Sequence, residues 1–448
     1  MTASFQPASP TTASTQDLRV DQALSQLASL LQPLGPVAEV ETLALADALD
    51  RVLAEDIVSP VDVPAHDNAA MDGYAFDGGQ LQAAHAGSPA APLVLRVVGQ
   101  ALAGKPWHGT VQVGECIKIM TGAVLPSGLD TVIAHERTGS AGADHIGIPA
   151  GSVRAGDNRR LRGEDLSLGR VALAAGQRLH PAALGLIASL GQPQVRVRRR
   201  LRVAYFSTGD EILHPGTAPR EGAVYDSNRF SLIGLLQRMG VQVLDLGVVA
   251  DEPEALQERL REAASLADVV LTSGGISAGE ADHTRAMLQR MGCVHFWRLA
   301  MRPGRPLAVG LLQPDAGTPF AASRTPARTT VLIGLPGNPV AAMVSFLVFV
   351  RPALLQLMGA AQAAAEPAAL PQAVAAHALS KRPGRTEYQR GLLSTGADGR
   401  CLVRTTGPQG SGVLRSMAEA DCLIVLEHER GAVQAGETVS ILPLPAFP

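Results

Sequence analysis

The chain is poor in aromatic residues and in cysteine. Phe, Trp and Tyr make up 3% of its 448 residues, whereas hydrophobic residues reach 46%, so the core must be built mainly from Ala, Val and Leu. The four cysteines, Cys116, Cys293, Cys401 and Cys422, are scattered and form no C-x-x-C pair. This pattern argues against a disulfide framework or a zinc ribbon and favours a reducing compartment. We therefore expect a cytoplasmic protein.

An excess of one charge and a long apolar run are also missing. The 38 basic and 41 acidic residues give a net charge of −3, which predicts neither nucleic acid nor a membrane surface as a partner. The first sixteen residues are rich in Ser, Thr and Ala and lack the apolar stretch of a signal peptide, so we expect them to be disordered. The longest apolar run, Val340–Val350, is too short to span a bilayer and predicts a buried helix.

Glycine and proline are abundant, with 46 and 31 residues, and the chain is too long for one ordinary domain. The N-terminal part predicts helices at Val20–Leu34 and Leu45–Leu53. A small β-rich module should follow, because its short apolar stretches are interrupted by Gly and Pro. We predict its strands at Leu93–Val98, Glu115–Met120, Thr131–His135 and His145–Ile148.

From Leu201 onwards, strand and helix patterns alternate, which indicates a parallel sheet covered on both faces. The expected strands are Arg202–Ser207, Val241–Gly247, Val269–Thr272 and Thr330–Ile333, and the expected helices are Phe230–Met239, Glu254–Ala267, Thr284–Met291 and Val340–Val350. Pro314–Arg328 should be an exposed insertion between two strands. Met358–Leu379 should be a linker or a weak helix, and Gly384–Leu442 predicts a small β-barrel or sandwich.

Three glycine-bearing loops should follow the carboxyl ends of strands, where parallel sheets bind their ligands. Glycine lets backbone amides approach an anion closely, and a helix N-terminus adds a favourable dipole. One such loop alone is an ordinary turn, but three together favour a site for a nucleotide or a pterin phosphate. The candidate ligand-binding residues are Thr208, Gly209, Asp210, Glu211, Ser273, Gly274, Gly275, Ser277, Gly279, Asp282, Pro336, Gly337, Asn338 and Pro339. Neither G-x-x-x-x-G-K-[ST] nor a G-x-G-x-x-G in the Rossmann position occurs, so generic ATPases and dehydrogenases are not indicated.

Arg302 and Arg305 lie three residues apart around a Pro-Gly turn, so both guanidinium groups can point to one side and bind an oxyanion. A solvated basic turn explains the spacing equally well. Arg385 and Ser411, in the last domain, could add further oxyanion ligands, although their spacing alone is a weak signal.

The acidic residues form a second set: Asp210, Glu211, Asp226, Asp251, Asp282, Glu164 and Asp165. Carboxylate oxygens suit a Mg²⁺ ion that is bridged to phosphate. Each acid alone is better explained as a helix cap or a surface charge, and both Asp226 and Asp282 precede a predicted helix. No histidine has metal-ligand spacing, and no Ser/His/Asp or Cys/His arrangement predicts a covalent mechanism.

With these residues in view, the sequence resembles the molybdopterin molybdenumtransferase family, the group of MoeA and the gephyrin E domain. The resemblance runs from about Asp17 to Leu442 and rests on six separated motifs in the same order. These motifs lie at Asp62–Ala75, Ile119–Ala123, Ser207–Glu211, Ser273–Gly275, Leu335–Pro339 and Gly410–Gly412.

The resemblance implies an elongated homodimer of four-domain subunits, with an active cleft between the α/β domain of one subunit and the N-terminal domains of its partner. The expected fold class is multidomain α/β plus β: a central parallel α/β sheet domain, a β-rich N-terminal subdomain and a C-terminal β-barrel-like domain. The expected boundaries are a disordered N-terminus at 1–16, a discontinuous linker and dimerisation domain at 17–61 and 155–194, an inserted β-rich subdomain at 62–154, a molybdopterin-binding α/β domain at 195–360 and a C-terminal β domain at 361–448.

The resemblance also implies a reaction, in which molybdate is inserted into adenylylated molybdopterin with release of AMP and with Mg²⁺ as cofactor. The implied catalytic residues are Thr121, Glu164, Asp226 and Asp251, with Asp67 and Asp72 in a loop that completes the site of the partner subunit. The implied molybdate ligands are Arg302, Arg305, Arg385 and Ser411. Our hypothesis for the metal ligands is that Mg²⁺ is held by acids among Asp210, Asp226, Asp251 and Glu164. Transient protein partners would be a pterin adenylyltransferase and apo-molybdoenzymes.

Two features depart from the family pattern. Arg302 and Arg305 stand where the family usually has lysines, so forked donors replace point charges. Ala341 stands where a serine often follows the Pro-Gly-Asn-Pro motif. Two other functions stay open at this point: a pterin adenylyltransferase, which has the same sheet type in a single domain, and a scaffold that keeps the fold without the chemistry.

Overall fold

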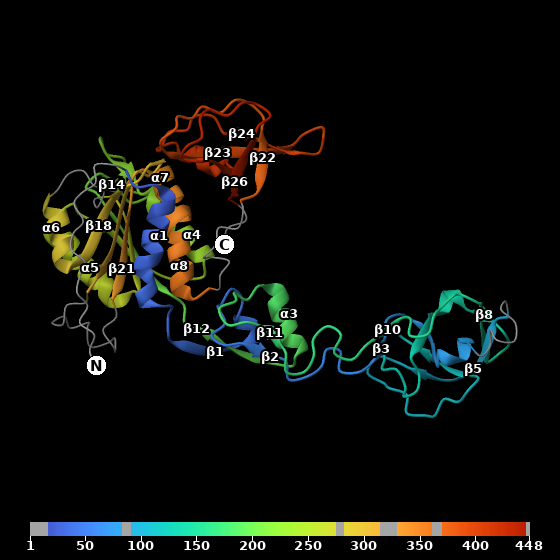
Figure 1. The fold of residues 1–448 in the computed structure, drawn as a ribbon. Coiled ribbons are helices and arrows are strands. Elements are labelled where there is room, and N and C mark those ends of the chain that lie inside the picture. The colour runs from blue at the N-terminus through green and yellow to red at the C-terminus, as the bar shows by residue number, and fades with distance from the viewer. Residues whose placement is uncertain (1–16, 83–90, 275–281, 314–328, 361–369, 445–448) are drawn as a thin grey trace.

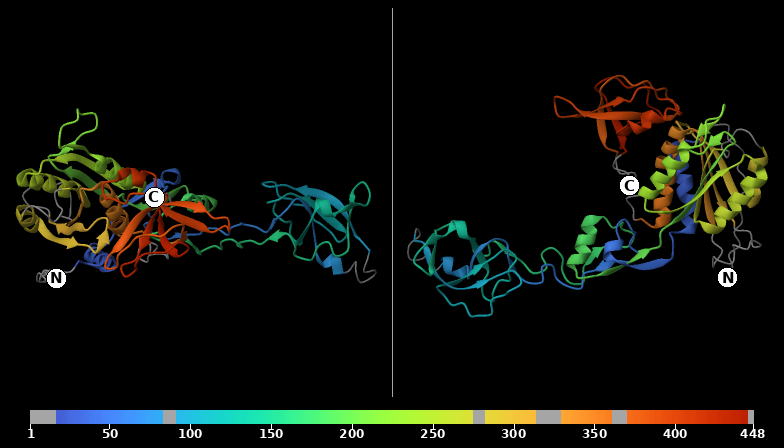
Figure 2. Two further views of the ribbon diagram at one scale, coloured as in Figure 1. Left: turned by 90° about the horizontal axis from the view of Figure 1, so that it is seen from above. Right: turned by 180° about the vertical axis from the view of Figure 1, so that it is seen from behind.

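The computed structural model describes residues 17–82, 91–274, 282–313, 329–360 and 370–444. They form an elongated molecule in which an α/β body carries a small β domain, and an arm runs from the body to a lobe at the far end (Figures 1 and 2). The predicted disordered N-terminus, 1–16, and the predicted insertion, Pro314–Arg328, lie outside the described residues.

The body is built on a six-stranded sheet with the order β16-β13-β17-β21-β20-β18. The first four strands are parallel: β16 (Gln242–Val249), β13 (Arg202–Thr208), β17 (Val269–Ser273) and β21 (Thr330–Leu335). The last two, β20 (Pro306–Leu312) and β18 (Gly292–Arg298), run antiparallel to their neighbours. The predicted α/β fold is confirmed, and the sheet is mixed because of two strands that the alternating pattern does not predict.

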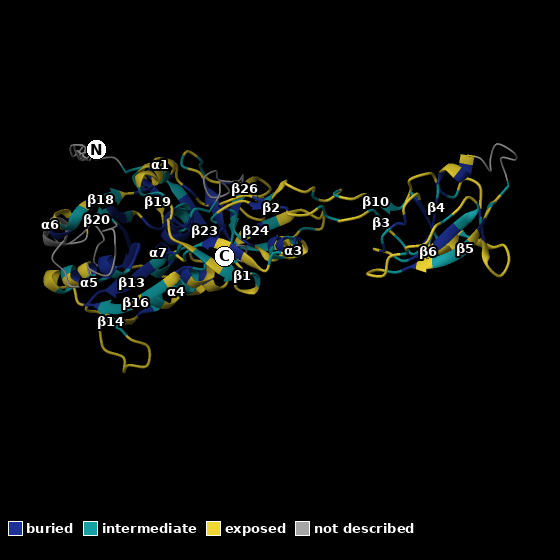
Figure 3. Ribbon diagram, turned by 90° about the horizontal axis from the view of Figure 1, so that it is seen from below, coloured by how far each residue is buried: buried dark blue, intermediate teal, exposed yellow. Residues whose placement is uncertain are grey.

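Helices cover both faces of this sheet. Those that follow the parallel strands are α4 (Ser227–Arg238), α5 (Pro253–Leu266) and α6 (Asp282–Met291). Successive side chains of β13 point to opposite faces, so Val203 and Tyr205 enter the core beneath α4, and Ala204 and Phe206 enter the core beneath α5 and α6. All four side chains are buried, as is most of the sheet (Figure 3).

A long helix packs on one face of the sheet. It comprises α7 (Pro339–Ser345), a π-helical segment (Phe346–Val350) and α8 (Arg351–Met358), so the helix predicted at Val340–Val350 is confirmed and continues through α8. By length and composition Pro339–Met358 resembles a membrane span, with a mean hydropathy of 1.9, but 67% of its most apolar window is buried inside the protein. It is therefore a core helix. α1 (Val20–Leu31) packs beside α8, so this part of the predicted 17–61 domain lies with the body (Figure 1).

The C-terminal domain is a closed β-barrel. Its strands are β22 (Gln372–Ala375), β23 (Thr386–Thr395), β24 (Cys401–Thr405), β25 (Cys422–Leu426) and β26 (Thr438–Pro443), and a short helix, α9 (Leu414–Ala418), lies between β24 and β25. The barrel closes because β23 pairs with both β24 and β25. β19 (Met301–Arg302), which comes before β20 in the chain, pairs in parallel with β23 and so joins the body to the barrel.

The arm begins with two short antiparallel pairs. β1 (Val40–Ala44) pairs with β12 (Gln194–Arg198), and β2 (Ile57–Val58) pairs with β11 (Val171–Leu173). A helix that the sequence pattern does not predict, α3 (Pro181–Ser189), packs beside them.

The helix predicted at Leu45–Leu53 is wrong. Only a 3-10 turn, Leu45–Asp47, forms there. Asp50 has a positive φ of 61°, which ends any helix, and Val52 and Leu53 make β-bridges instead. Pairing with distant strands therefore overrides the local apolar spacing.

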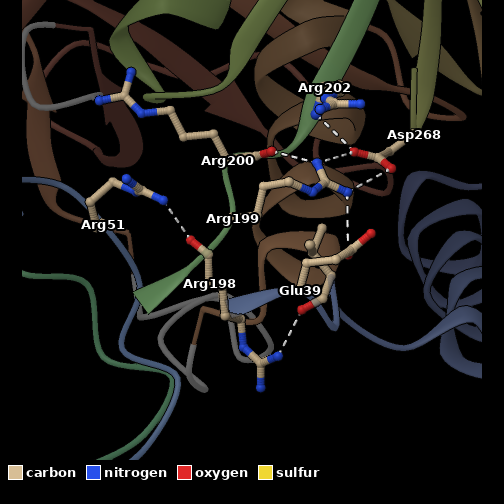
Figure 4. A network of polar contacts seen from close by, with 8 residues as sticks. Glu39, Arg51, Arg198, Arg199, Arg200, Arg202 and Asp268 are labelled. Carbon is tan, nitrogen blue, oxygen red and sulfur yellow. Dashed lines mark hydrogen bonds and ion pairs between the residues drawn. The ribbon is translucent and has the colours of Figure 1, made fainter. Parts of the chain in front are cut away.

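Where the arm meets the body, an ion pair between a buried carboxylate and a partly buried guanidinium group joins two chain segments. Arg199 binds both carboxylate oxygens of Asp268, at 3.0 and 3.2 Å, and contacts Glu39 at 3.4 Å (Figure 4). Asp268 is 4% exposed and also accepts a hydrogen bond from the Arg202 amide. The start of β13 is thereby fixed to the residue that precedes β17.

The lobe at the end of the arm contains a six-stranded sheet. Its strands, in sheet order, are β7 (Thr131–Ala134), β4 (Gly73–Phe76), β6 (Glu115–Ile119), β5 (Leu93–Ala101), β9 (His145–Ile148) and β8 (Gly139–Ser140). The four predicted strands are confirmed. The chain enters and leaves the lobe side by side, where β3 (Asn68–Ala69) pairs with β10 (Arg159–Arg160) (Figure 1).

Candidate active site

A cleft of about 610 Å³ opens at the carboxyl ends of the parallel strands of the body. The three glycine loops predicted from the sequence all contribute to it. Among the predicted ligand-binding residues, Thr208, Glu211, Ser273, Gly274, Gly337, Asn338 and Pro339 line the cleft. Gly209, Asp210 and Pro336 belong to the same loops, Asp282 is the first residue of α6, and Gly275, Ser277 and Gly279 lie outside the described residues.

The loops after β13, β17 and β21 touch one another at the bottom of the cleft. Gly274 has a φ of +88°, and a Cβ placed on it would lie 2.4 Å from the Thr208 carbonyl oxygen. The Gly274 amide donates to the Leu335 carbonyl oxygen at 3.2 Å, and a Cβ on Gly337 would lie 3.7 Å from the Gly274 Cα. Glycine is therefore required at 274 for the three loops to converge.

Four buried polar side chains form a chain of hydrogen bonds beneath the cleft. The Tyr205 hydroxyl lies 2.9 Å from Ser207 Oγ and 2.7 Å from Ser273 Oγ, and Ser207 Oγ donates to Asp226 Oδ2 at 2.7 Å. None of the four residues is more than 3% exposed. Burial raises the pKa of the Tyr205 phenol, in spite of its two hydroxyl partners, so the phenol stays protonated.

Asp226 caps helix α4. Its Oδ1 accepts from the Arg229 amide at 3.0 Å, while Oδ2 accepts from Ser207. Of the two roles that the sequence allows for Asp226, capping and metal binding, the structure contains the cap. Capping by Asp satisfies an amide that the helix itself leaves unpaired.

Two buried polar atoms beside this cap have no hydrogen-bond partner among the described residues: Asn228 Oδ1 and Thr208 Oγ1. The other end of the Asn228 amide is engaged, because Nδ2 donates to the Gly337 carbonyl oxygen at 2.7 Å. Both residues line the cleft. Since buried polar atoms are normally satisfied, these two are positioned to receive a ligand.

Asp210 and Asp251 lie side by side at the same end of the sheet. The Asp251 amide donates to Asp210 Oδ1 at 3.2 Å, and both residues are exposed. The predicted metal set of Asp210, Asp226, Asp251 and Glu164 does not assemble within one chain, because Glu164 follows β10 at the base of the lobe. Within the described ranges, no group of three or more His, Cys, Asp or Glu side chains could hold a metal ion. Two carboxylates are nevertheless sufficient protein ligands for Mg²⁺ when substrate phosphates and water complete the shell.

The catalytic residues predicted in the N-terminal half lie beside β3, β4, β6 and β10, at the far end of the arm from the body (Figure 1). Asp72 Oδ1 accepts from the Thr121 hydroxyl at 2.6 Å and from the Thr121 amide at 2.7 Å, and these bonds lower the pKa of Asp72. Glu164 is bound by Arg160 Nε at 2.6 Å, which lowers its pKa. Asp67 accepts from a backbone amide at 2.7 Å. A single chain therefore does not bring these residues to the cleft.

Arg302 and Arg305 line two different hollows. Arg302 borders a cavity of about 250 Å³, whereas Arg305 borders an open hollow of about 740 Å³ and binds both oxygens of Asp17, at 2.9 and 3.1 Å. The two guanidinium groups separate because Arg302 ends β19, which pairs with the barrel, while the residue after Arg305 begins β20 in the body. Their spacing allows either one shared oxyanion site or a solvated basic turn, and in this arrangement the two guanidinium groups do not border one shared site.

The cavity beside Arg302 contains a second cation, Arg390 of β23, which the sequence analysis does not single out. Arg390 is 1% exposed, and its side-chain partners among the described residues are neutral: Ser416 Oγ at 3.0 Å and the carbonyl oxygens of Pro408 and Gly410 at 3.3 and 3.0 Å. Burial, together with the charge of Arg302, lowers the pKa of Arg390 to about 10. The pair therefore makes the cavity attractive to an anion.

The other two predicted molybdate ligands lie near this cavity. Arg385 donates through Nε to Glu387 at 2.9 Å, and Glu387 lines the cavity. The Ser411 carbonyl oxygen accepts from the Val340 amide at 3.1 Å, and the next residue, Gly412, lines the cleft. The loop that Arg390 binds at Gly410 thus connects the cavity to the cleft.

Three family models match successive parts of the chain. The MoeA N-terminal region (domain I and II) matches residues 18–191, the "probable molybdopterin binding domain" matches 204–356, and the MoeA C-terminal region (domain IV) matches 372–444. The molybdopterin molybdenumtransferase of Haemophilus influenzae is 38% identical over 426 residues, which cover 95% of this chain and 98% of that protein. The enzyme of the same name from Nostoc sp. is 34% identical over 93% of this chain and 92% of its own length.

A solved structure has the same overall arrangement. The molybdopterin biosynthesis moeA protein from Pyrococcus horikoshii OT3 superimposes with a TM-score of 0.72 at 26% sequence identity, covering 96% of this chain and all of that one. The fold and the cleft, with these matches, define a transferase of molybdenum cofactor biosynthesis that contains a molybdopterin-binding domain. More narrowly, the chain belongs to the molybdopterin molybdenumtransferase family, MoeA, which confirms the resemblance found in its motifs.

Proposed function

We propose that this protein inserts molybdate into adenylylated molybdopterin with release of AMP, which yields the molybdenum cofactor. The observation that carries the proposal is the cleft, which lies inside the part of the chain matched by the molybdopterin-binding model. Three glycine loops converge there, together with two buried polar atoms that have no hydrogen-bond partner in the described part of the chain. The relatives that align over nearly the whole chain are named for this transferase activity.

The adenylylated pterin occupies this cleft. Backbone amides of the glycine loops suit its phosphates, and the start of α7 adds a favourable dipole beside Asn338. No covalent intermediate with the protein is required. The contribution of the chain is to position two reactants and to neutralise their charge.

A bound Mg²⁺ would supply charge neutralisation at the pyrophosphate, which would make AMP a better leaving group. Asp210 and Asp251 are the residues of this chain that would hold it, because they are adjacent, exposed and close to the glycine loops. Asp226 supports them indirectly, since both of its oxygens are engaged in the α4 cap.

Molybdate binds in the cavity between the body and the barrel. The Arg302 side chain is exposed there, and its guanidinium group has no hydrogen-bond partner in the described part of the chain, so its forked donors are available to an oxyanion. Arg390 adds a buried positive charge, and Arg385 and Ser411 lie at the border of the same region. Arg305 can join the site only when its ion pair with Asp17 opens.

The active form is a homodimer in which the lobe of one subunit completes the cleft of the other. Within one chain, Asp67, Asp72, Thr121 and Glu164 lie beside strands β3, β4, β6 and β10, and the arm separates these strands from the body (Figure 1). A partner that lies antiparallel would bring its lobe to the cleft, and the linker domain (17–61 and 155–194) would make the dimer contacts.

A pterin adenylyltransferase delivers the substrate and apo-molybdoenzymes receive the product in the cytoplasm, where the four free cysteines stay reduced.

The test is AMP release by the purified protein from adenylylated molybdopterin and Mg²⁺, with and without molybdate. Molybdate-dependent release, with a product that activates an apo-molybdoenzyme, supports the proposal. AMP transfer from ATP onto free molybdopterin would instead identify an adenylyltransferase. Bound pterin without any AMP release would identify a carrier or scaffold. Light scattering in the same buffer measures whether the particle has twice the mass of the 46.5 kDa chain.

A further inference from the structure

The hydrogen bonds beneath the cleft can be assigned a direction by following each hydrogen. A carboxylate oxygen accepts and cannot donate, so Ser207 uses its only hydrogen on Asp226. The contact between Ser207 and Tyr205 must then use the hydrogen of Tyr205. Because that hydrogen is committed, the contact of 2.7 Å between Tyr205 and Ser273 requires Ser273 to donate. The hydrogens therefore point from Ser273 to Tyr205, then to Ser207, then to Asp226.

In this order the Ser273 hydroxyl has no hydrogen left to donate, so it can only accept a hydrogen bond from a ligand. Ser273 lines the cleft at the end of β17, and its hydrogen is directed at Tyr205 below. The geometry is held by the sheet, because Ser207 and Ser273 are register partners on adjacent strands and Tyr205 is two residues before Ser207 on the same face. The four residues of this chain of hydrogen bonds are at most 3% exposed, so bulk water does not compete for their hydrogens.

A second acceptor belongs to a residue that lines the same cleft. Asn228 Oδ1 is buried and has no hydrogen-bond partner among the described residues, and its orientation is fixed because Nδ2 donates to the Gly337 carbonyl oxygen. Neither of these two acceptors can bind a phosphate or a carbonyl oxygen, since these groups also only accept. The two acceptors favour a ligand edge that carries N–H or O–H groups.

We propose that Ser273 determines specificity by accepting a hydrogen bond from an N–H edge of the ligand, and that Tyr205 is the positioning residue that fixes Ser273 as an acceptor. The 2-amino-4-oxo edge of a pterin has this chemistry, with an amino group beside a ring N–H. The inference rests on the proposed function for the identity of the ligand, and it adds which edge of the pterin is recognised and by which atom.

The test uses two probes that differ at this edge. 6-Hydroxymethylpterin has a 2-amino group, and 6-hydroxymethyllumazine has a carbonyl oxygen in its place. Binding of each probe to the full-length protein is measured by calorimetry. The wild-type protein should prefer the pterin by about tenfold or more, because the lumazine loses a hydrogen bond and places an acceptor against an acceptor.

Two substitutions free the Ser273 hydrogen by different routes. Tyr205→Phe removes the group that accepts it, and Ser207→Ala frees the Tyr205 hydrogen to point at Ser273. In both variants Ser273 can donate to the lumazine oxygen, so the preference should fall to about threefold or less. Ser273→Ala should weaken pterin binding without any gain for lumazine. Thr330→Val removes a buried hydroxyl from the opposite end of the same sheet and should leave the preference unchanged.

A preference that stays at its wild-type value in both Tyr205→Phe and Ser207→Ala, with melting temperatures close to that of Thr330→Val, would overturn the inference. Equal affinity of the wild-type protein for the two probes would also overturn it. In either case, molybdate-dependent AMP release would leave the proposed function standing. Absence of both pterin binding and AMP release in the wild-type protein would remove the inference and the proposed function together.

Discussion

Thr121 binds one carboxylate oxygen of Asp72 twice, through its hydroxyl at 2.6 Å and its amide at 2.7 Å. This contact joins two sequence motifs that are 49 residues apart, the loop before β4 and the loop after β6. It fixes a negative charge on the surface of the lobe rather than in its core. The charge is therefore available to a partner subunit, as the proposed homodimer requires.

The first prediction concerns this contact. Thr121→Val keeps the shape and the amide but removes the hydroxyl, which has the larger part in lowering the pKa of Asp72. We expect the pKa of Asp72 to rise towards its usual value, as measured by carbon NMR titration of the carboxyl group. Thr121→Ser keeps the hydroxyl and should titrate like the wild-type protein. Identical titration curves for the valine and serine variants would show that the hydroxyl has no such effect.

The same shift has a consequence for stability against pH. Since the pKa of Asp72 is lower in the folded state, its contribution to stability is fully present above the unfolded pKa of about 4 and is lost as the pH falls through the folded value. Thr121→Val should reduce this contribution, so wild type and variant should differ most at neutral pH and converge in strong acid. Thermal melting across this pH range measures the difference.

The second prediction concerns the converging loops. Gly274→Ala places a methyl group 2.4 Å from the Thr208 carbonyl oxygen and forces alanine into a positive φ, which alone costs about 1–2 kcal/mol. We expect a lower melting temperature and loss of pterin binding. Gly337→Ala, in the same cleft, meets no atom closer than 3.7 Å and should fold with nearly wild-type stability. Equal stability of the two variants would mean that the loops do not converge as described.

The third prediction separates the two arginines. Arg302→Ala removes the available guanidinium from the cavity and should raise the molybdate concentration for half-maximal AMP release about 10- to 100-fold. Arg302→Lys keeps the charge and should have a smaller effect. Arg305→Ala should also have a smaller effect, because Arg305 is already bound to Asp17. Arg400→Ala, on the barrel surface, is the control. A larger effect of Arg305→Ala than of Arg302→Ala would place molybdate in the other hollow.

The fourth prediction concerns the junction between arm and body. Asp268→Asn removes the buried carboxylate that binds the partly buried Arg199 guanidinium and leaves it only the longer contact with Glu39, which should lower the free energy of unfolding by about 2–3 kcal/mol. Asp398→Asn breaks an exposed ion pair with Arg400 and should change stability little. Denaturant titration of both variants measures the contrast. Similar small effects would mean that water reaches the Arg199–Asp268 pair.

The parts of the fold that local patterns specify could be predicted from the sequence. The parallel strands of the body are short apolar runs, and the glycines that follow them determine where the loops turn. The position of the cleft follows, because the carboxyl ends of parallel strands meet at one edge of a sheet. Gly274 is an example: its residue type already indicates a close backbone approach, and the Thr208 carbonyl oxygen is what it approaches.

Features that depend on distant pairing could not be predicted. The segment Leu45–Leu53 has helical spacing, yet Val52 and Leu53 bridge to residues more than a hundred positions later. Arg390 has no sequence signal, because its burial depends on carbonyl groups at 408 and 410 that fold over it. The separation of Arg302 from Arg305 likewise depends on which of two sheets each flanking strand joins.

Two chain segments connect the lobe to the arm, and backbone hydrogen bonds join these two segments to each other. The Ser59 amide donates to the Arg170 carbonyl oxygen, and the Gly169 amide donates to the Ser59 carbonyl oxygen, both at 2.9 Å. Deletion of residues 60–168 would therefore join Ser59 directly to Gly169, two residues that a backbone hydrogen bond already holds together. In the proposed homodimer, exchange of this lobe as a unit would replace the residues offered to the partner subunit and leave the cleft of the body unchanged.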